Sequence, residues 1–237
     1  AVRLLLQQGE ICPKYLFVPE HQLLLTLLFL KTLKVKPLMK EFWEKRYAAE
    51  EYAYGKAPNT FLRTELEHLE PGHALFPAEG EGRNAVYAAQ LGWSVEAFDY
   101  SNAARQKALR LAKDSQVNLQ YQVASIESFP FERKEYDLIA LFFVHLPPTL
   151  RQQLHAACAS ALRPGGTLLL EAFHKEQLPL QSGGPKQETL LFSLEDLEAD
   201  FAALSLGQIS RQRVILEEGP YHHGPAETVR IRATKHQ

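Results

Sequence analysis

Short apolar runs alternate with amphipathic stretches along most of this chain. Residues 74–76 form one apolar run, a glycine turn and an Ala-rich segment follow, and a second run at 95–98 ends on Asp99. Runs of about four to eight apolar residues bounded by turn residues are typical of buried strands, whereas the Ala-rich segment between them suits a helix. The pattern therefore predicts a strand, a loop, a helix and a second strand.

The same alternation continues to the end of the chain. Residues 136–144 are almost unbroken apolar, as in a central strand covered on both faces. The last two β-rich runs are joined by a turn-rich segment and predict an antiparallel hairpin, which a plain dinucleotide-binding sheet lacks. Further helices are predicted at 101–113, 148–162 and 193–203, and further strands at 119–123, 167–173, 209–216 and 228–234.

Glycines mark the junction between the first strand and its helix. Gly80 and Gly82 lie in this turn, and Asp99 follows Gly82 by 17 positions. In nucleotide-binding folds such glycines let a ligand approach the backbone, and such an acid accepts hydrogen bonds from ribose hydroxyls. The spacing also fits a tight turn without a ligand, because glycine is the default residue where the backbone bends sharply.

The charges in this loop bear on which nucleotide it would bind. Glu79 and Glu81 flank Gly80, and Arg83 offsets only part of their charge. A pyrophosphate beside them would be repelled by roughly several kcal/mol in a partly dry site. S-adenosylmethionine has no phosphate, carries a sulfonium and an ammonium, and still offers ribose hydroxyls to Asp99. The alternative is that both glutamates point to solvent.

The segment LFPAEGEGRNAVYAAQLGWSVEAFDYS, residues 75–101, resembles the first two motifs of class I S-adenosylmethionine-dependent methyltransferases. The likeness is nearest to the small-molecule branch that contains tellurite-resistance and thiopurine methyltransferases. It runs from about Phe42 to Thr234 and includes the LRPGGT turn at 162–167. It implies an α/β fold with a Rossmann-like seven-stranded, mostly parallel sheet, helices on both faces and an antiparallel last strand. It departs at Phe76-Pro77-Ala78, where most of the family has an acid at the end of the first strand.

The resemblance also implies a cofactor site for S-adenosylmethionine at the ends of the strands. Ser125 stands where the family more often has Asp. The expected contacts are Gly80 and Gly82 with the methionine portion, Glu79 with its ammonium, Asp99 with the ribose hydroxyls, Tyr100 and Ile126 with the adenine faces, and Ser125 with the adenine amino group.

An aromatic-rich segment, 41–62, precedes the first strand. The resemblance implies that it lies across the mouth of the cofactor cleft, with Trp43, Arg46, Tyr47 and Tyr54 forming a lid or touching substrate. The alternative is a helix that covers the core and ends in a Pro-Asn turn.

His145 follows the apolar run 136–144, at the end of a strand where open α/β sheets keep their ligands. An imidazole accepts protons near neutral pH, so His145 is the candidate catalytic base or a ring that stacks beside the cofactor. The alternative is that it caps the strand by bonding to a neighbouring carbonyl.

Composition narrows the functional classes. At 237 residues and 46% apolar content the chain can bury one substantial core, and its net charge of −2 argues against nucleic-acid partners. Cys12 and Cys158 match no metal-ligand spacing. His222 and His223 are adjacent, so on a strand they would face opposite ways, and no metal site is predicted. A reduced, cytoplasmic protein without membrane partners is the expectation.

The first 38 residues differ from the rest. They hold five basic and two acidic residues, and the apolar run Leu23 to Leu30 is far shorter than the roughly 20 residues of a membrane-spanning helix. The only methionine is Met39. We therefore expect 1–38 to be an N-terminal extension and 39–237 to be the methyltransferase domain, which should fold alone. The alternative is an amphipathic helix packed on the outside.

The functional expectation is methyl transfer from S-adenosylmethionine to a small-molecule nucleophile. Two other classes stay open at this point. An NAD-dependent oxidoreductase would share the glycine loop and Asp99 but conflicts with the two glutamates and the final hairpin. A cofactor-binding protein without catalysis would share every feature except a productive acceptor site.

Overall fold

The computed structural model describes residues 39–131 and 135–237. The extension predicted over 1–38 lies outside them. The chain divides after Glu41, and the fold is that of the unit from Phe42 to Gln237.

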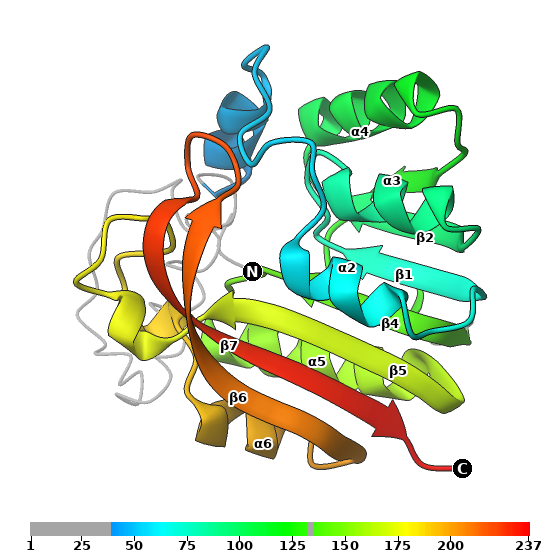
Figure 1. The fold of residues 1–237 in the computed structure, drawn as a ribbon, viewed down its shortest axis with the longest axis vertical. Coiled ribbons are helices and arrows are strands. Elements are labelled where there is room, and N and C mark those ends of the chain that lie inside the picture. Colours follow the sequence, from blue (N-terminus) through cyan, green and yellow to red (C-terminus); the bar gives the residue numbers. More distant parts are fainter. Residues whose placement is uncertain (1–38, 132–134) are drawn as a thin grey trace, which may run out of the picture. The chain divides into compact units, whose positions relative to one another are not determined.

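Seven strands form one sheet in the order β3-β2-β1-β4-β5-β7-β6 (Figure 1). The first five strands pair in parallel, and β7 runs antiparallel to both β5 and β6. This confirms the predicted fold class. The strands are β1 His73–Pro77, β2 Ser94–Asp99, β3 Gln120–Val123, β4 Tyr136–Phe142, β5 Leu162–Phe173, β6 Leu204–Glu217 and β7 His223–Lys235.

The helices begin at the residues that the capping chemistry favours. Asn59, Ser101 and Ser193 accept hydrogen bonds from the first turns of α2, α4 and α6, and Ser193 with Asp196 forms the predicted capping box. The helices are α2 Thr60–Leu66, α3 Arg83–Gln90, α4 Asn102–Asp114, α5 Pro148–Ala161 and α6 Leu194–Asp200, with 3₁₀ turns at Lys175–Gln177 and Glu188–Leu190.

The strands of the hairpin are longer than the apolar pattern predicts. β6 is the edge strand, paired only with β7 among the described strands, and most of its side chains are partly or fully exposed. The part of β6 before residue 209 carries two leucines of the core, Leu204 and Leu206, but Gly207 follows them and the register with β7 shifts there. A glycine and a bulge inside a strand interrupt its apolar pattern, so the pattern predicts a strand that begins too late.

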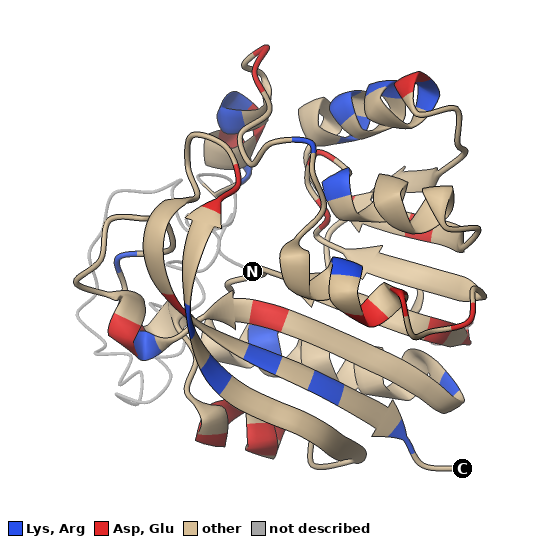
Figure 2. Ribbon diagram, in the orientation of Figure 1, with Lys and Arg blue, Asp and Glu red and all other residues tan. Residues whose placement is uncertain are grey.

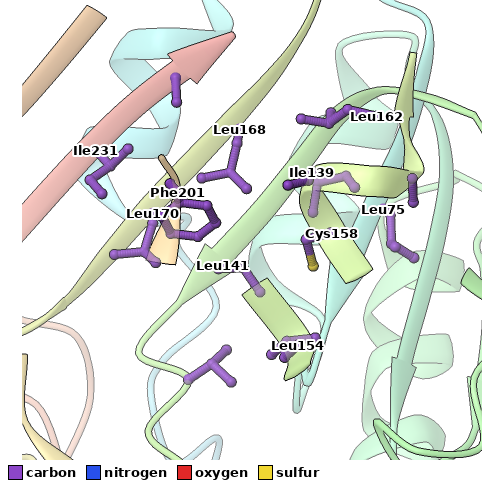
Figure 3. Packing of buried hydrophobic residues seen from close by; sticks show 14 of the residues in the cluster. Leu75, Ile139, Leu141, Leu154, Cys158, Leu162, Leu168, Leu170, Phe201 and Ile231 are labelled. Atoms are coloured by element: carbon purple, nitrogen blue, oxygen red, sulfur yellow. The ribbon is translucent and has the colours of Figure 1, made fainter. Parts of the chain in front are cut away.

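Alternation along the strands builds a core on each face of the sheet. Leu75 and Ile139 point to the face covered by α5 and α6, where they pack with Leu154 and Phe201 (Figure 3). Their neighbours on β1 and β4 point to the other face and pack against α2, α3 and α4. This two-faced burial explains why β4 reads as a continuous apolar run.

Gly82 sets the distance between two of the covering helices. It is the N-cap of α3 with φ +87°, and a Cβ there would lie 2.6 Å from the Cβ of Ala108 on α4. The glycine thus lets α3 and α4 pack closely against each other. Among the described residues, no helix combines the length and the apolar content needed to cross a bilayer.

Gly82→Ala should lower the free energy of unfolding by about 2 to 5 kcal/mol, because it adds a clash with Ala108 to the cost of a left-handed backbone. Gly165→Ala is the matched control, since Gly165 has φ +76° and nothing within 4 Å of a Cβ. It should lose only about 1 to 2 kcal/mol. Denaturant unfolding of both variants measures the difference, and equal losses would contradict the close helix contact.

Candidate functional site

The site is built at the carboxyl ends of the parallel strands. The turn from β1 into α3 has left-handed backbone at Ala78, Gly80 and Gly82, with φ of 50°, 66° and 87°. Ala78 adopts this conformation although it carries a side chain, which is a local cost typical of functional loops. The turn brings the N-terminus of α3 beside the end of β2.

Asp99 occupies the position that the sequence predicts for it. Its side chain lies at the end of β2 and accepts hydrogen bonds from the Gly80 N–H at 3.2 Å and the Ser101 N–H at 2.8 Å. Burial raises the pKa of Asp99 to about 6 against the opposing effect of these bonds. The carboxylate is thus costly to charge without a ligand that stabilises it.

Glu79 points inward, contrary to the solvent-facing alternative. One of its carboxylate oxygens accepts hydrogen bonds from the N–H groups of Asn84 and Ala85, each at 2.9 Å, and so caps the first turn of α3. Burial raises the pKa of Glu79 to about 7. These N–H groups are the ones that a pyrophosphate would use. The Glu79 contact with a methionine ammonium stays a prediction.

Glu81 is buried and compensated, which corrects the sequence argument that it acts as a free charge. It pairs with Lys107 of α4 and accepts a hydrogen bond from the Ala53 N–H at 2.8 Å. Lys107 also donates to the carbonyls of Ala49 and Glu51. Residues 49–59, which we call the strap, are thereby held against the glycine loop. The argument against a phosphate therefore rests on Glu79.

Glu44 is a site residue that the sequence reasoning missed. One of its oxygens accepts from the Ala103 N–H at 3.1 Å, and the other is buried without a hydrogen-bond partner among the described residues. Its charge contributes to the raised pKa of Asp99. Nothing in the local pattern separates Glu44 from the other acids of 41–51. We call Glu44, Glu79 and Asp99 the acidic cluster.

The residues expected at the adenine lie beside this cluster. Ile126 packs on the edge of the core together with Ala78 and Leu146, at the ends of three different strands. Tyr100 is partly exposed. Ser125 turns toward Ser128, and their hydroxyls lie 3.2 Å apart. The apolar surface suits one face of an adenine ring, whereas the adenine contact of Ser125 stays a prediction.

The two loop glycines face protein atoms. A side chain at Gly80 would meet the Tyr47 hydroxyl at 2.8 Å, and one at Gly82 would meet Ala108. Gly82 therefore serves helix packing. Because Gly80 has no side chain, Tyr47, in the segment before the strap, can pack closely against the glycine loop.

The predicted lid residues come together with the hairpin turn at residues 218–222. Trp43 stacks on Tyr47, with ring centroids 5.4 Å apart. Arg46 donates to the Tyr54 hydroxyl at 3.0 Å. The Tyr54 ring lies 4.4 Å from that of His222. We call the rings of Trp43, Tyr47, Tyr54, Phe143, Tyr221 and His222 the aromatic wall.

The sequence reasoning did not place the hairpin turn in the site. Its signal was an aromatic pair, Tyr221 and His222, within a Gly- and Pro-rich turn. His222 precedes β7 and is buried, whereas His223 is exposed. Glu218 pairs with Arg83 at 2.8 Å and with His222 at 3.2 Å. Despite burial, these two bonds hold the pKa of Glu218 at about 2.

His145 has both ring nitrogens engaged. Nδ1 lies 2.7 Å from the Leu190 carbonyl, and Nε2 accepts from the Phe173 N–H at 3.2 Å, which sets the tautomer. The ring stacks between Phe173 and Phe192, and burial lowers its pKa to about 4. As placed, neither nitrogen is free to accept a proton from a substrate. The catalytic role predicted for His145 stays untested.

Residues 77–166, from the glycine loop to the Pro-Gly-Gly turn, match the family model described as a methyltransferase domain. Over these residues the chain is similar to a methyltransferase domain. No curated protein sequence matches it.

Solved structures share the fold of this chain at low sequence identity. One comes from work on the conversion of a disulfide bond into a thioacetal group during echinomycin biosynthesis. It shows 17% identity and a TM-score of 0.66, and the match covers 80% of this chain and 86% of that one. TehB from Haemophilus influenzae shows 15% identity, TM-score 0.62 and coverage of 83% and 66%. The N-methyltransferase NodS from Bradyrhizobium japonicum WM9, in complex with S-adenosyl-L-homocysteine, shows 14%, 0.63 and coverage of 84% and 98%.

S-adenosylmethionine is the cofactor that similarity to a methyltransferase domain implies, and the acidic cluster fits it. The buried oxygen of Glu44 without a partner and the raised pKa values of Glu79 and Asp99 mark a site short of positive charge. A cofactor with a sulfonium and an ammonium supplies that charge. A dinucleotide would instead add negative charge beside Glu79.

Cofactor affinity should fall as the pH drops below about 6, because Asp99 must then lose a proton before its carboxylate can accept hydrogen bonds from the ribose hydroxyls. Asp99 alone predicts roughly tenfold weaker binding near pH 5 than near pH 7.5, with Glu79 adding to the slope. Binding should also release protons in this range. Calorimetry in buffers of different ionisation enthalpy measures both effects.

Asp99→Asn is the control for this prediction, because it cannot titrate. It should bind more weakly at every pH and show a smaller pH slope. A native affinity that stays flat between about pH 5 and pH 7.5 would contradict the assignment.

Proposed function

We propose that this protein is an S-adenosylmethionine-dependent methyltransferase that acts on a small-molecule nucleophile. The observation that carries the proposal is the acidic cluster lying next to the aromatic wall at one edge of the sheet. Tyr47 connects the glycine loop of the cofactor site with the aromatic wall, because its hydroxyl lies beside Gly80 and its ring stacks on Trp43. A donor held by the cluster would thus be close to an acceptor held by the wall.

The chain's part in the reaction is positioning and the exclusion of water. The bound cofactor supplies a methyl group activated by the sulfonium charge. Asp99, rigidly held by two backbone N–H groups, orients the ribose. The strap and the aromatic wall cover the acceptor side with apolar surface. Bringing two reactants into line in this way can account for much of a rate enhancement without a covalent intermediate.

The strained backbone after β4 supports the same location for the acceptor. Phe143 has φ 56° and no glycine-like freedom, yet it is held there by a hydrogen bond from its N–H to the Glu171 carbonyl at 2.7 Å. This turns its ring toward His222, with centroids 4.5 Å apart. Backbone strain of this kind clusters where a site needs a fixed side chain.

The two alternatives fare differently. An NAD-dependent oxidoreductase is disfavoured because Glu79 already occupies the N-terminus of α3. A cofactor-binding protein without catalysis is separated from a methyltransferase by turnover. Incubation with S-adenosylmethionine and a panel of small thiols, amines and phenols should release S-adenosylhomocysteine above the acceptor-free background. Cofactor binding without release against any acceptor would favour the binding protein.

Asp99→Ala should weaken S-adenosylmethionine binding by about 1.5 to 3 kcal/mol, the usual worth of hydrogen bonds to a charged group. Asp114→Ala is the matched control, since Asp114 is exposed at the end of α4. Calorimetry on both variants, with melting temperatures to verify folding, makes the comparison. An Asp99→Ala variant of normal stability and unchanged affinity would remove Asp99 from the site.

His145→Asn should retain turnover within roughly tenfold, because an asparagine amide can donate toward Leu190 and accept from the Phe173 N–H. His145→Phe keeps an aromatic ring but loses both bonds, so stability, cofactor affinity and turnover should fall together. If His145 is instead the catalytic base, His145→Asn should lose about 100-fold or more in turnover with little change in cofactor affinity. Steady-state kinetics separates the two roles.

A further inference from the structure

Arg46 differs from the arginines of β6 and β7 in what surrounds its charge. Figure 2 shows basic positions along β6 and β7, and there the arginines pair with carboxylates, as Arg230 does with Glu171 at 2.8 Å and Arg211 with Glu227 at 2.9 Å. Arg46 forms no ion pair with any residue that the structure describes. An arginine inside a site that has no carboxylate partner is suited to bind an anionic group of a ligand.

Three aromatic rings lie close to the Arg46 guanidinium. Its central carbon lies 4.1 Å from the ring centroid of Tyr221, 4.5 Å from that of Phe42 and 5.2 Å from that of Trp43. Cation–π contacts of this kind hold the guanidinium in a fixed orientation without neutralising it. The positive charge is therefore fixed in place while remaining available to a ligand.

The edge of the guanidinium keeps donors for a ligand. Arginine has five N–H groups in one plane, and here Nη1 donates to the Tyr54 hydroxyl at 3.0 Å. Among the described residues, no carbonyl or carboxylate accepts from these N–H groups. A planar oxyanion is the partner that matches such a fork.

The surroundings of Arg46 are open on one side and closed on the other. Phe42 and Tyr221 are 50% and 46% exposed, whereas Tyr47 and His222 are 6% and 5% exposed. The closed side leads through Tyr47 to Gly80 and the cofactor site. An acceptor entering from solvent would therefore pass between two exposed rings and reach Arg46 before it reached the donor.

We propose that Arg46 recognises a carboxylate of the methyl acceptor, so that the acceptor is a small anionic molecule with a flat apolar body. The inference rests on the proposed function and adds the substrate class to it. The carboxylate is the group that binds and is distinct from the nucleophile that takes the methyl group. One arginine among rings balances one negative charge, whereas a phosphate dianion would leave excess charge in an apolar setting.

Three matched probes test this assignment on the full chain saturated with S-adenosylhomocysteine. Benzoate, benzamide and benzylamine share a flat ring and differ in charge. Calorimetry should find benzoate bound about 10-fold or more tightly than benzamide, with benzylamine the weakest. In Arg46→Gln the ratio between benzoate and benzamide should fall to about one. Arg46→Lys should keep part of the preference, because it retains the charge but loses the planar fork.

Arg213→Gln is the control, since the Arg213 side chain is 71% exposed on β6, and it should leave the ratio unchanged. Using the ratio separates recognition from packing, because a loosened aromatic wall would weaken all probes together. No benzoate preference in the native chain, or a preference that survives in a folded Arg46→Gln, overturns the inference. S-adenosylhomocysteine is titrated first, and its failure to bind overturns the proposed function instead.

Discussion

The burial of several carboxylates around one glycine loop is the constraint on which the site depends. Glu79 and Asp99 are desolvated, and their pKa values rise to about 7 and about 6. Backbone N–H groups from the loop and the α3 N-terminus hold them in position against that cost. A positive charge bound beside these carboxylates would stabilise their ionised forms. Burying these carboxylates lowers stability locally, but it holds them in position for a ligand.

A second set of polar contacts positions the acceptor side relative to this cluster. Asn59, at the end of the strap, caps α2 and donates to Glu171 of β5 at 2.7 Å and to Glu218 of the hairpin turn at 3.2 Å. Glu218 in turn binds Arg83 at the start of α3. One buried network thus ties the strap, the sheet and the hairpin together. The aromatic wall is carried by these elements, so its geometry depends on polar contacts beneath it.

Much of the fold was readable because burial leaves a pattern in the sequence. The continuous apolar runs of β1 and β4 and the capping serines each reflect a local rule, and the structure follows them. The Pro-Gly-Gly turn was expected before the fifth strand, but β5 begins at Leu162, and its register with β4 shifts across this segment. The first residues of the edge strand β6 were missed, because Gly207 and the register shift beside it interrupt the pattern that Leu204 and Leu206 begin. In the site, the position of Asp99 at the end of β2 was predictable because parallel strands bring their carboxyl ends to a common edge. Glu44 was not predictable, because nothing near it in sequence marks it, and the aromatic pair Tyr221 and His222 in the hairpin turn does not by itself show that the turn reaches the site.

The sequence by itself determined the order of elements, the glycine turn, the acid at the end of β2 and the aromatic content of the first segment. The tertiary structure alone decided which charges are compensated. It gave Glu81 a partner in Lys107 and engaged both nitrogens of His145, but it surrounded Arg46 with rings from Phe42, Trp43 and Tyr221. The physical reason is that the charge state and reach of a side chain depend on neighbours distant in sequence. Local pattern fixes where a residue sits along an element, whereas packing fixes what it faces.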